Sequence, residues 1–189
     1  MTTMLTRRAF VVGAPLALAA CSAQPVWAPD AAVNAAVYRS NGPSALTLFT
    51  VKNVSSGNGA HSGLLIDAEQ RVLFDPAGSF KATSTPERND VLFGFSPAAE
   101  RAYISFHARI EFYVVIQKVT VSPAVANQAL RLALANGAEP KAHCSRSISG
   151  LLTQLPGFDA VGSSWFPNNL SDDFAGVAGV TTREVREQD

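Results

Sequence analysis

The chain has 189 residues, of which 47% are hydrophobic and 16% charged, and its formal net charge is +0. This length and apolar content support one domain with a buried core plus accessory segments, and they argue against a largely disordered chain. The sequence contains no basic block or stripe, so nucleic acid is not an expected partner.

The N-terminus has the three parts of an export signal. Arg7 and Arg8 form a basic start, an apolar run follows from Phe10 to Ala20, and small residues precede Cys21. The apolar run is too short to span a bilayer as a mature helix. The letters "LAAC", which end at Cys21, resemble a bacterial lipobox, in which the cysteine is acylated and becomes the first mature residue. We therefore expect a signal peptide over 1–20 and lipid on Cys21, with an ordinary secretory signal as the alternative.

Processing at this point would place the protein in the cell envelope. Loss of Arg7 and Arg8 leaves 13 basic against 15 acidic residues, a net charge of −2. Ser22 follows Cys21, which resembles lipoproteins sorted to the outer membrane, so the expected location is its periplasmic face. "TRRAF" also resembles a twin-arginine signal, and the choice between the two export routes stays open.

Residues 21–44 are rich in Ala, Pro, Ser and Asn, a composition typical of a linker. We expect a lipid-anchored tether there that folding does not require, and a compact domain over 45–189. A strand is predicted over 45–54 from β-branched and aromatic content, and a hairpin is predicted from 61–67 and 71–75.

Residues 79–96 are expected to be mostly loop, with Ser96 capping a short helix. The next predicted strand, 109–121, is nearly unbroken in β-forming residues and is expected to be central in a sheet. Ser122 and Pro123 start a predicted helix that ends before Gly137.

A last helix is predicted from Cys144, with apolar residues at 148, 151, 152 and 155, and no element is assigned to the tail around Trp165. The fold class is therefore α+β, an antiparallel sheet with helices packed on one side. Nothing in the sequence indicates a particular oligomeric state.

Cys144 stands in the first turn of its predicted helix, where unpaired backbone N–H groups and the helix dipole favour negative charge. Such a position lowers the pKa of a thiol, and the thiolate is the nucleophilic form. If Cys21 carries lipid, Cys144 has no disulfide partner in the chain, so it is either a reactive thiol or an inert buried one.

Two histidines are rival partners for this thiol. His143 is adjacent to Cys144, but neighbouring helix residues point in different directions, so we expect His143 to be a surface or capping residue. His61 opens a strand after a Gly-rich turn, and Gly63 on the same strand face leaves room for a partner. His61 is the better candidate for a cysteine–histidine pair, although a lone histidine here is also typical of a structural residue.

The segments "HSGLLI" (61–66) and "HCSRSISGLL" (143–152), in this order, resemble the circularly permuted branch of the NlpC-like papain-fold cysteine hydrolases. That branch includes the lecithin retinol acyltransferase-like proteins, and the resemblance spans roughly residues 60–155. It implies a permuted papain-like domain with a histidine that precedes the cysteine. Many relatives have Asn before the cysteine, where this chain has His143.

In that family a third group on the neighbouring strand orients the imidazole. Asp75 stands at the matching position, although it also opens an Asp-Pro-Ala-Gly turn, and His107 is the rival orienter. A zinc site built from His61, His107, His143 and Cys144 lacks the usual ligand spacing, so neither metal nor cofactor is expected.

The expected function is a lipid-anchored cysteine hydrolase or acyltransferase that acts on an amide or ester bond in the cell envelope. Cys144 would attack the carbonyl, His61 would move the proton and Asp75 would orient His61. A cell-wall stem peptide and a lipid acyl bond remain alternative substrates. The alternative function is a non-catalytic envelope lipoprotein that keeps the fold for binding or as a scaffold.

Overall fold

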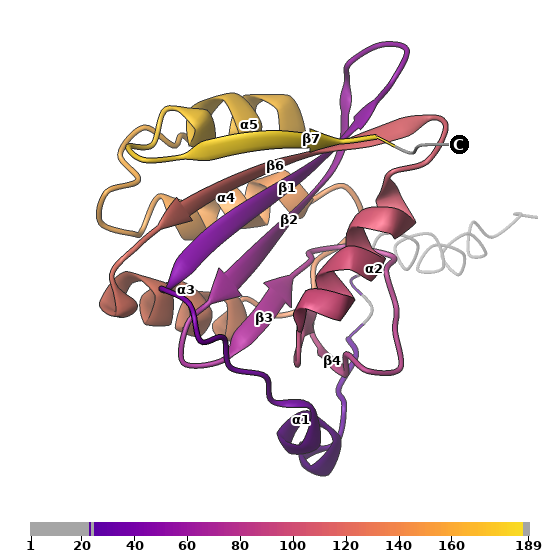
Figure 1. The fold of residues 1–189 in the computed structure, drawn as a ribbon, viewed down its shortest axis with the longest axis vertical. Coiled ribbons are helices and arrows are strands. Elements are labelled where there is room, and N and C mark those ends of the chain that lie inside the picture. The colour runs from indigo at the N-terminus through magenta and orange to yellow at the C-terminus, as the bar shows by residue number, and fades with distance from the viewer. Residues whose placement is uncertain (1–22, 24, 187–189) are drawn as a thin grey trace, which may run out of the picture.

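A computed structural model describes residue 23 and residues 25–186. Its core is a seven-stranded antiparallel sheet in the order β4-β5-β3-β2-β1-β6-β7 (Figure 1). The strands are β1 (Ala45–Asn53), β2 (Gly59–Asp67), β3 (Arg71–Phe74), β4 (Glu87–Arg88), β5 (Val91–Leu92), β6 (Phe112–Thr120) and β7 (Thr181–Val185). The helices are α1 (Asp30–Ala36), α2 (Pro97–His107), α3 (Pro123–Ala135), α4 (Cys144–Leu152) and α5 (Pro167–Ala175). The predicted signal peptide and Cys21 lie outside the described residues.

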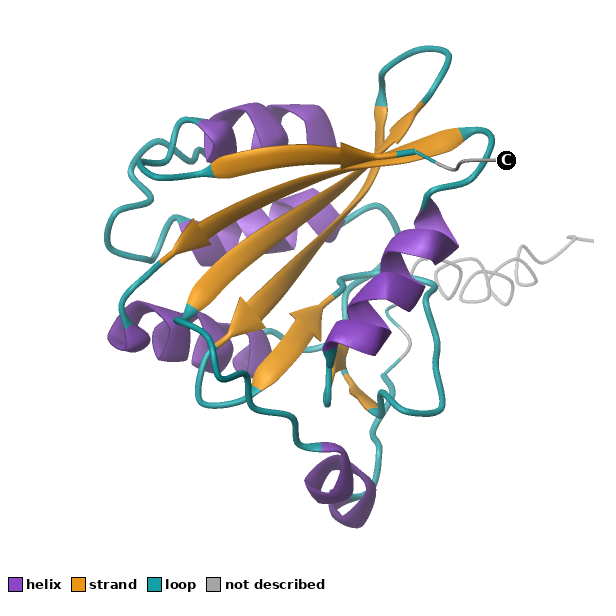
Figure 2. Cartoon of the chain, viewed as in Figure 1, coloured by secondary structure: helices purple, strands orange, loops and turns teal. Residues whose placement is uncertain are grey.

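The α+β class and the antiparallel sheet are confirmed, but the helices cover both faces of the sheet. Helices α3, α4 and α5 lie on one face, and α2 lies on the other (Figure 2). Strands β1 and β2 explain this, because both of their faces are apolar. Leu64 and Ile66 of β2 belong to the cluster with α3, α4 and α5, whereas Leu65 packs with Tyr103 of α2. The expectation of helices on one side only is wrong, because each apolar face has to be shielded from water.

The predicted helix starts are confirmed by their caps. The side chain of Ser96 accepts a hydrogen bond from the Ala99 N–H at the start of α2, and Ser122 does the same for the Val125 N–H in α3. These contacts satisfy backbone donors that no helical carbonyl reaches. All four predicted apolar positions are buried, although α4 ends at Leu152 and Leu155 lies beyond it. The three positions within the helix fix the side that meets the sheet.

Three parts of the chain differ from expectation around the sheet edges. The region expected to be loop contains the short hairpin β4–β5, whose turn residues Asn89 and Asp90 have φ angles of 44° and 67°. Two positive φ angles match the twist of a tight hairpin, and Asn and Asp adopt them more readily than most residues. Strand β6 is not central, because it lies next to the edge strand β7. The unassigned tail supplies α5 and β7.

Residues 25–44 are packed on the domain rather than forming a free tether. Val33 of α1 is 7% exposed and belongs to the main hydrophobic cluster. The backbone of Ala28 donates to the Glu87 carbonyl at 2.9 Å, and Arg71 donates to the Tyr38 carbonyl at 2.8 Å. The segment before Ala45 therefore packs along the β3–β5–β4 edge of the sheet.

Within the described part of the chain, none of the helices is both long enough and apolar enough to cross a bilayer.

Candidate active site

The site lies where β2, the end of β3, α2 and the start of α4 meet. His61 is near the beginning of β2, on the strand face that points toward α2. Asp75 directly follows β3, and the pairing of Leu64 with Phe74 brings Asp75 beside Gly63. The hairpin predicted from the sequence therefore brings His61 and Asp75 to the same face of the sheet.

His61 and Asp75 are joined by a short hydrogen bond. The Nε2 atom of His61 lies 2.7 Å from Oδ1 of Asp75, whose side chain is buried. The hydroxyl of Tyr103, on α2, donates to the same oxygen at 2.8 Å. Two donors thus converge on one carboxylate oxygen and fix the orientation of both the carboxylate and the imidazole ring.

Gly63 makes this arrangement possible. A Cβ atom at this position would lie 2.5 Å from the Tyr103 hydroxyl oxygen and 3.1 Å from Oδ1 of Asp75. The space that the sequence assigned to a partner at Gly63 is therefore filled by the groups that hold His61. Only a residue without a side chain allows this close approach.

Cys144 is the first residue of α4, as predicted, and its thiol is hydrogen-bonded to the His61 side chain. Because Nε2 of His61 bonds to Asp75, the other ring nitrogen, Nδ1, is the one that faces the sulfur. The backbone N–H of Ser62 also donates to Cys144, and the Ser145 hydroxyl lies 4.0 Å from Sγ. Ser145 is fixed in turn by the Ser62 hydroxyl at 3.2 Å.

The electrostatics favour the ionised form of the pair. Burial of the His61 ring lowers its pKa, but the charge of Asp75 and hydrogen bonds to Asp75 and Cys144 outweigh burial and raise the pKa to about 10. Burial raises the pKa of Cys144, and the contacts with His61, Ser62 and Ser145 more than offset it, so the pKa lies below its ordinary value. Both shifts favour a thiolate beside an imidazolium.

Asp75 keeps its charge despite full burial. Burial raises its pKa, whereas the charge of His61 and the hydrogen bonds from His61 and Tyr103 lower it by more. The electrostatics of the site therefore favour a carboxylate on Asp75, an imidazolium on His61 and a thiolate on Cys144.

His107, the rival orienter, lies beside His61 without taking the place of Asp75. Its ring stacks on the His61 ring with centroids 5.7 Å apart and planes inclined by 13°. Its Nδ1 atom lies 3.0 Å from the Tyr103 carbonyl oxygen. Burial lowers the pKa of His107, as does the charge of His61. His107 is thus a wall of the site and a second imidazole near the reacting groups.

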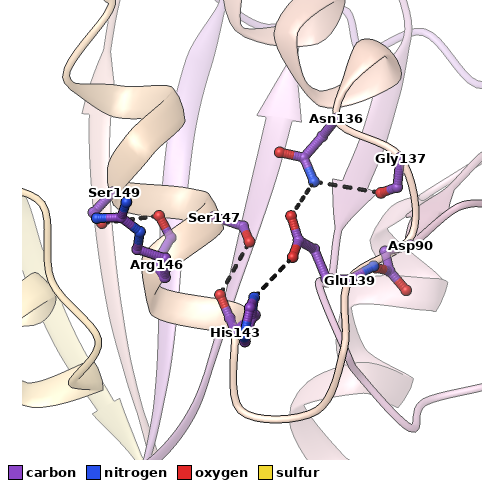
Figure 3. A network of polar contacts seen from close by, with 8 residues as sticks. All are labelled: Asp90, Asn136, Gly137, Glu139, His143, Arg146, Ser147 and Ser149. Carbon is purple, nitrogen blue, oxygen red and sulfur yellow. Dashed lines mark hydrogen bonds and ion pairs between the residues drawn. The ribbon is translucent and has the colours of Figure 1, made fainter. Parts of the chain in front are cut away.

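His143 precedes α4 and turns away from the thiol. Its Nδ1 atom lies 3.1 Å from Oε2 of Glu139 (Figure 3). Its ring meets the Trp165 ring edge-on at a centroid distance of 4.8 Å. Its carbonyl oxygen accepts from the backbone N–H of Ser147, as expected at a helix start. The structure therefore places His143 in a capping position rather than in the pair with Cys144.

A groove of about 530 Å³ opens beside the imidazoles. His61 and His107 form part of its wall together with apolar residues that include Ala60, Phe106, Ile110 and Phe112. Ile110 is 80% exposed at the rim. Cys144 is only 5% exposed and is not among the residues that line this groove, whereas His61 is.

The sequence reasoning did not identify Tyr103, Ser62 or Ser145 as members of the site. Tyr103 could have been identified from the sequence, because it lies in the apolar stripe of α2 and a buried tyrosine hydroxyl needs a hydrogen-bond partner. Ser62 and Ser145 could not have been identified in this way, since they are 83 residues apart in the sequence and no local pattern links them. Among the described residues, no group of three or more His, Cys, Asp or Glu side chains is arranged to hold a metal ion.

Comparison of the chain with protein-family models, with curated protein sequences and with solved structures gave no match.

Proposed function

We propose that this protein is a cysteine hydrolase or acyltransferase that cleaves an amide or ester bond, with Cys144 as nucleophile. The observation that carries this proposal is the hydrogen-bonded row Cys144–His61–Asp75–Tyr103, which joins α4, β2, the turn after β3 and α2. A core cysteine needs none of these partners. A nucleophilic thiol needs a base, and the base needs a group that orients it.

In the first step the Cys144 thiolate attacks the substrate carbonyl carbon, and a bond forms between Sγ and that carbon. The bond from the carbon to the leaving nitrogen or oxygen then breaks, and the His61 imidazolium gives its Nδ1 proton to the leaving group. The products of this step are a thioester on Cys144 and a neutral imidazole.

In the second step His61 takes a proton from water or from an acceptor hydroxyl or amine. The oxygen or nitrogen bonds to the thioester carbon, and the thiolate leaves while the imidazolium is restored. Water as acceptor gives hydrolysis, and any other acceptor gives acyl transfer. The backbone N–H of Cys144, at the first position of α4, is a donor for the oxyanion that forms in both steps.

The site's resemblance to the permuted NlpC-like hydrolases supports this proposal, because the histidine strand and the cysteine helix occur in the same order. The lipobox-like letters before Cys21 support a lipid anchor in the cell envelope. We therefore extend the proposal to a lipid-anchored enzyme on the periplasmic face of the outer membrane. Mass spectrometry of the mature N-terminus tests the anchor, and an unmodified peptide that contains Cys21 would contradict it.

A second candidate is a non-catalytic envelope lipoprotein in which Cys144 is a packed core residue. The 5% exposure of Cys144 favours it, since a buried apolar environment makes a thiol inert.

An acyl-trapping experiment separates the two candidates. The folded protein is incubated at neutral pH with an activated aryl ester and, separately, with an activated acyl amide, and the mass of each adduct is mapped by peptide. The proposal predicts a thioester on Cys144 that is absent from Cys144→Ser and strongly reduced in His61→Ala. Absence of any adduct on wild-type Cys144 would favour the non-catalytic protein.

A further inference from the structure

The β4–β5 turn lies between the two loops that carry the reacting groups. Its residue Asp90 accepts a hydrogen bond on its backbone carbonyl from the N–H of Asp75, at 2.8 Å. Asp90 therefore holds the first residue of the turn that begins with Asp75.

The same carboxylate also reaches the loop that leads into α4. Its Oδ2 atom accepts from the backbone N–H of Glu139 at 2.7 Å. The Glu139 carboxylate makes two further contacts (Figure 3). Its Oε1 atom accepts a hydrogen bond from the Asn136 side chain at 2.7 Å, and its Oε2 atom contacts Nδ1 of His143. His143 is the residue before Cys144. Asp90 thus connects two segments: its carboxylate holds the loop before the proposed nucleophile, and its backbone carbonyl holds the turn that begins with Asp75.

Both loops have backbone conformations that need support. Ala77 and Ala142 have φ angles of 57° and 68°, which residues with a Cβ atom rarely adopt. Such conformations persist only where the surrounding contacts fix them. The bond from the Glu139 N–H to the Asp90 carboxylate is charge-assisted, and such bonds are about twice as strong as those between neutral groups.

We propose that Asp90 is a positioning residue of this site, whose carboxylate sets the distance between the Cys144 loop and the Asp75 turn. Asp90 acts through other residues and does not contact the thiol. This inference rests on the proposed function. Small shifts matter here, because a displacement of about 1 Å between reacting groups can cost on the order of 100-fold in rate.

Two substitutions of Asp90 test the proposal. Asp90→Asn keeps the volume and tolerates the φ of 67°, but it removes the negative charge and puts an NH2 donor in place of one acceptor oxygen. Asp90→Ala removes both acceptors. Asp172→Asn, at an exposed position of α5, is the control for the loss of one negative charge.

The measurement is the rate of Cys144 alkylation by iodoacetamide in the folded protein from pH 5 to pH 9, with thermal unfolding recorded for each variant. Both Asp90 variants are expected to move the inflection upward, Ala more than Asn, and to slow alkylation at pH 6 by about tenfold, because the thiol approaches its free pKa. Asp172→Asn is expected to follow the wild-type curve.

The outcomes separate this inference from the proposed function. A wild-type inflection below the free-thiol value that both folded Asp90 variants retain would overturn the inference alone. A wild-type thiol that ionises like a free cysteine would overturn the proposed function and the inference with it. If Asp90→Ala does not fold, the curve of Asp90→Asn decides.

Discussion

Replacement of Asp75 by Asn tests the electrostatic basis of the site with a minimal change of shape. The amide oxygen of Asn can still accept from the Tyr103 hydroxyl and from Nε2–H of His61, so the geometry can persist without the negative charge. The charge of Asp75 is the largest of the influences that raise the pKa of His61. Without it, burial of the ring dominates, and burial lowers the pKa of a histidine.

The expected effect is large. The pKa of His61 should fall from about 10 to below its ordinary value of 6.5. A fall of more than three pKa units corresponds to roughly 4 to 5 kcal/mol of lost stabilisation of the imidazolium. Cys144 then loses its cationic neighbour, and burial should raise the pKa of its thiol again. A thiol with the free pKa of about 8.5 is only about 0.3% ionised at pH 6, so alkylation at that pH should slow by at least about tenfold.

Two assays read this variant. The imidazole resonances of His61, assigned by comparison with His61→Ala, report its protonation between pH 5 and pH 9, and iodoacetamide reports the thiolate. In wild type His61 should stay protonated through this range, whereas in Asp75→Asn it should titrate in the acidic part. Asp172→Asn controls for net charge. A wild-type His61 that titrates near 6.5, or an Asp75→Asn variant that keeps its imidazolium at pH 8, would refute the reasoning.

Four further outcomes follow from the contacts around the site. His61→Ala should move the Cys144 alkylation inflection upward while His143→Ala leaves it nearly unchanged; the reverse pattern in the same titration would assign the base to His143. Tyr103→Phe should lower the free energy of unfolding, measured in urea, by about 1–3 kcal/mol, because a buried carboxylate oxygen loses a donor, and unchanged stability would contradict this. Gly63→Ala should lower the melting temperature, since its Cβ would lie 2.5 Å from the Tyr103 hydroxyl. An unchanged melting temperature would show that α2 can shift away from the new methyl group without loss of stability. Deletion of residues 25–44 should also lower the melting temperature, because it exposes the hydrophobic cluster that contains Val33. An unchanged melting temperature would show that residues 25–44 are a tether that folding does not require.

The sequence predicted those parts of the site that depend on strand alternation, on the hairpin and on the helix start. Strand alternation puts His61 and Gly63 on one face, and the short hairpin return brings Asp75 to that face. Cys144 at a helix start follows from the apolar spacing of α4 and the break before it. The approach of Cys144 to His61 is different, since it depends on how α4 docks on β2. The sequence indicated it only by elimination of His143 and by the family resemblance.

Contacts between distant segments account for what the sequence did not indicate. Asp90 joins two loops from a turn without glycine, so the usual hairpin signal was missing. The segment around Val33 is rich in alanine and carries only one large buried residue, which hides its role in the core. Strand β7 is mostly exposed at the sheet edge and therefore lacks the alternation that identifies half-buried strands.

The central claim is that native structure activates Cys144, and the ratio of native to unfolded alkylation rates measures this directly. The wild-type protein is treated with iodoacetamide at pH 6.5 in buffer and in denaturant, and the modification of Cys144 is followed by mass spectrometry. The proposed thiolate–imidazolium pair predicts faster alkylation in the folded protein than in the unfolded chain, where the thiol has its free pKa. Alkylation of Cys144 only at the rate at which the protein unfolds would show a buried inert thiol and would contradict the account.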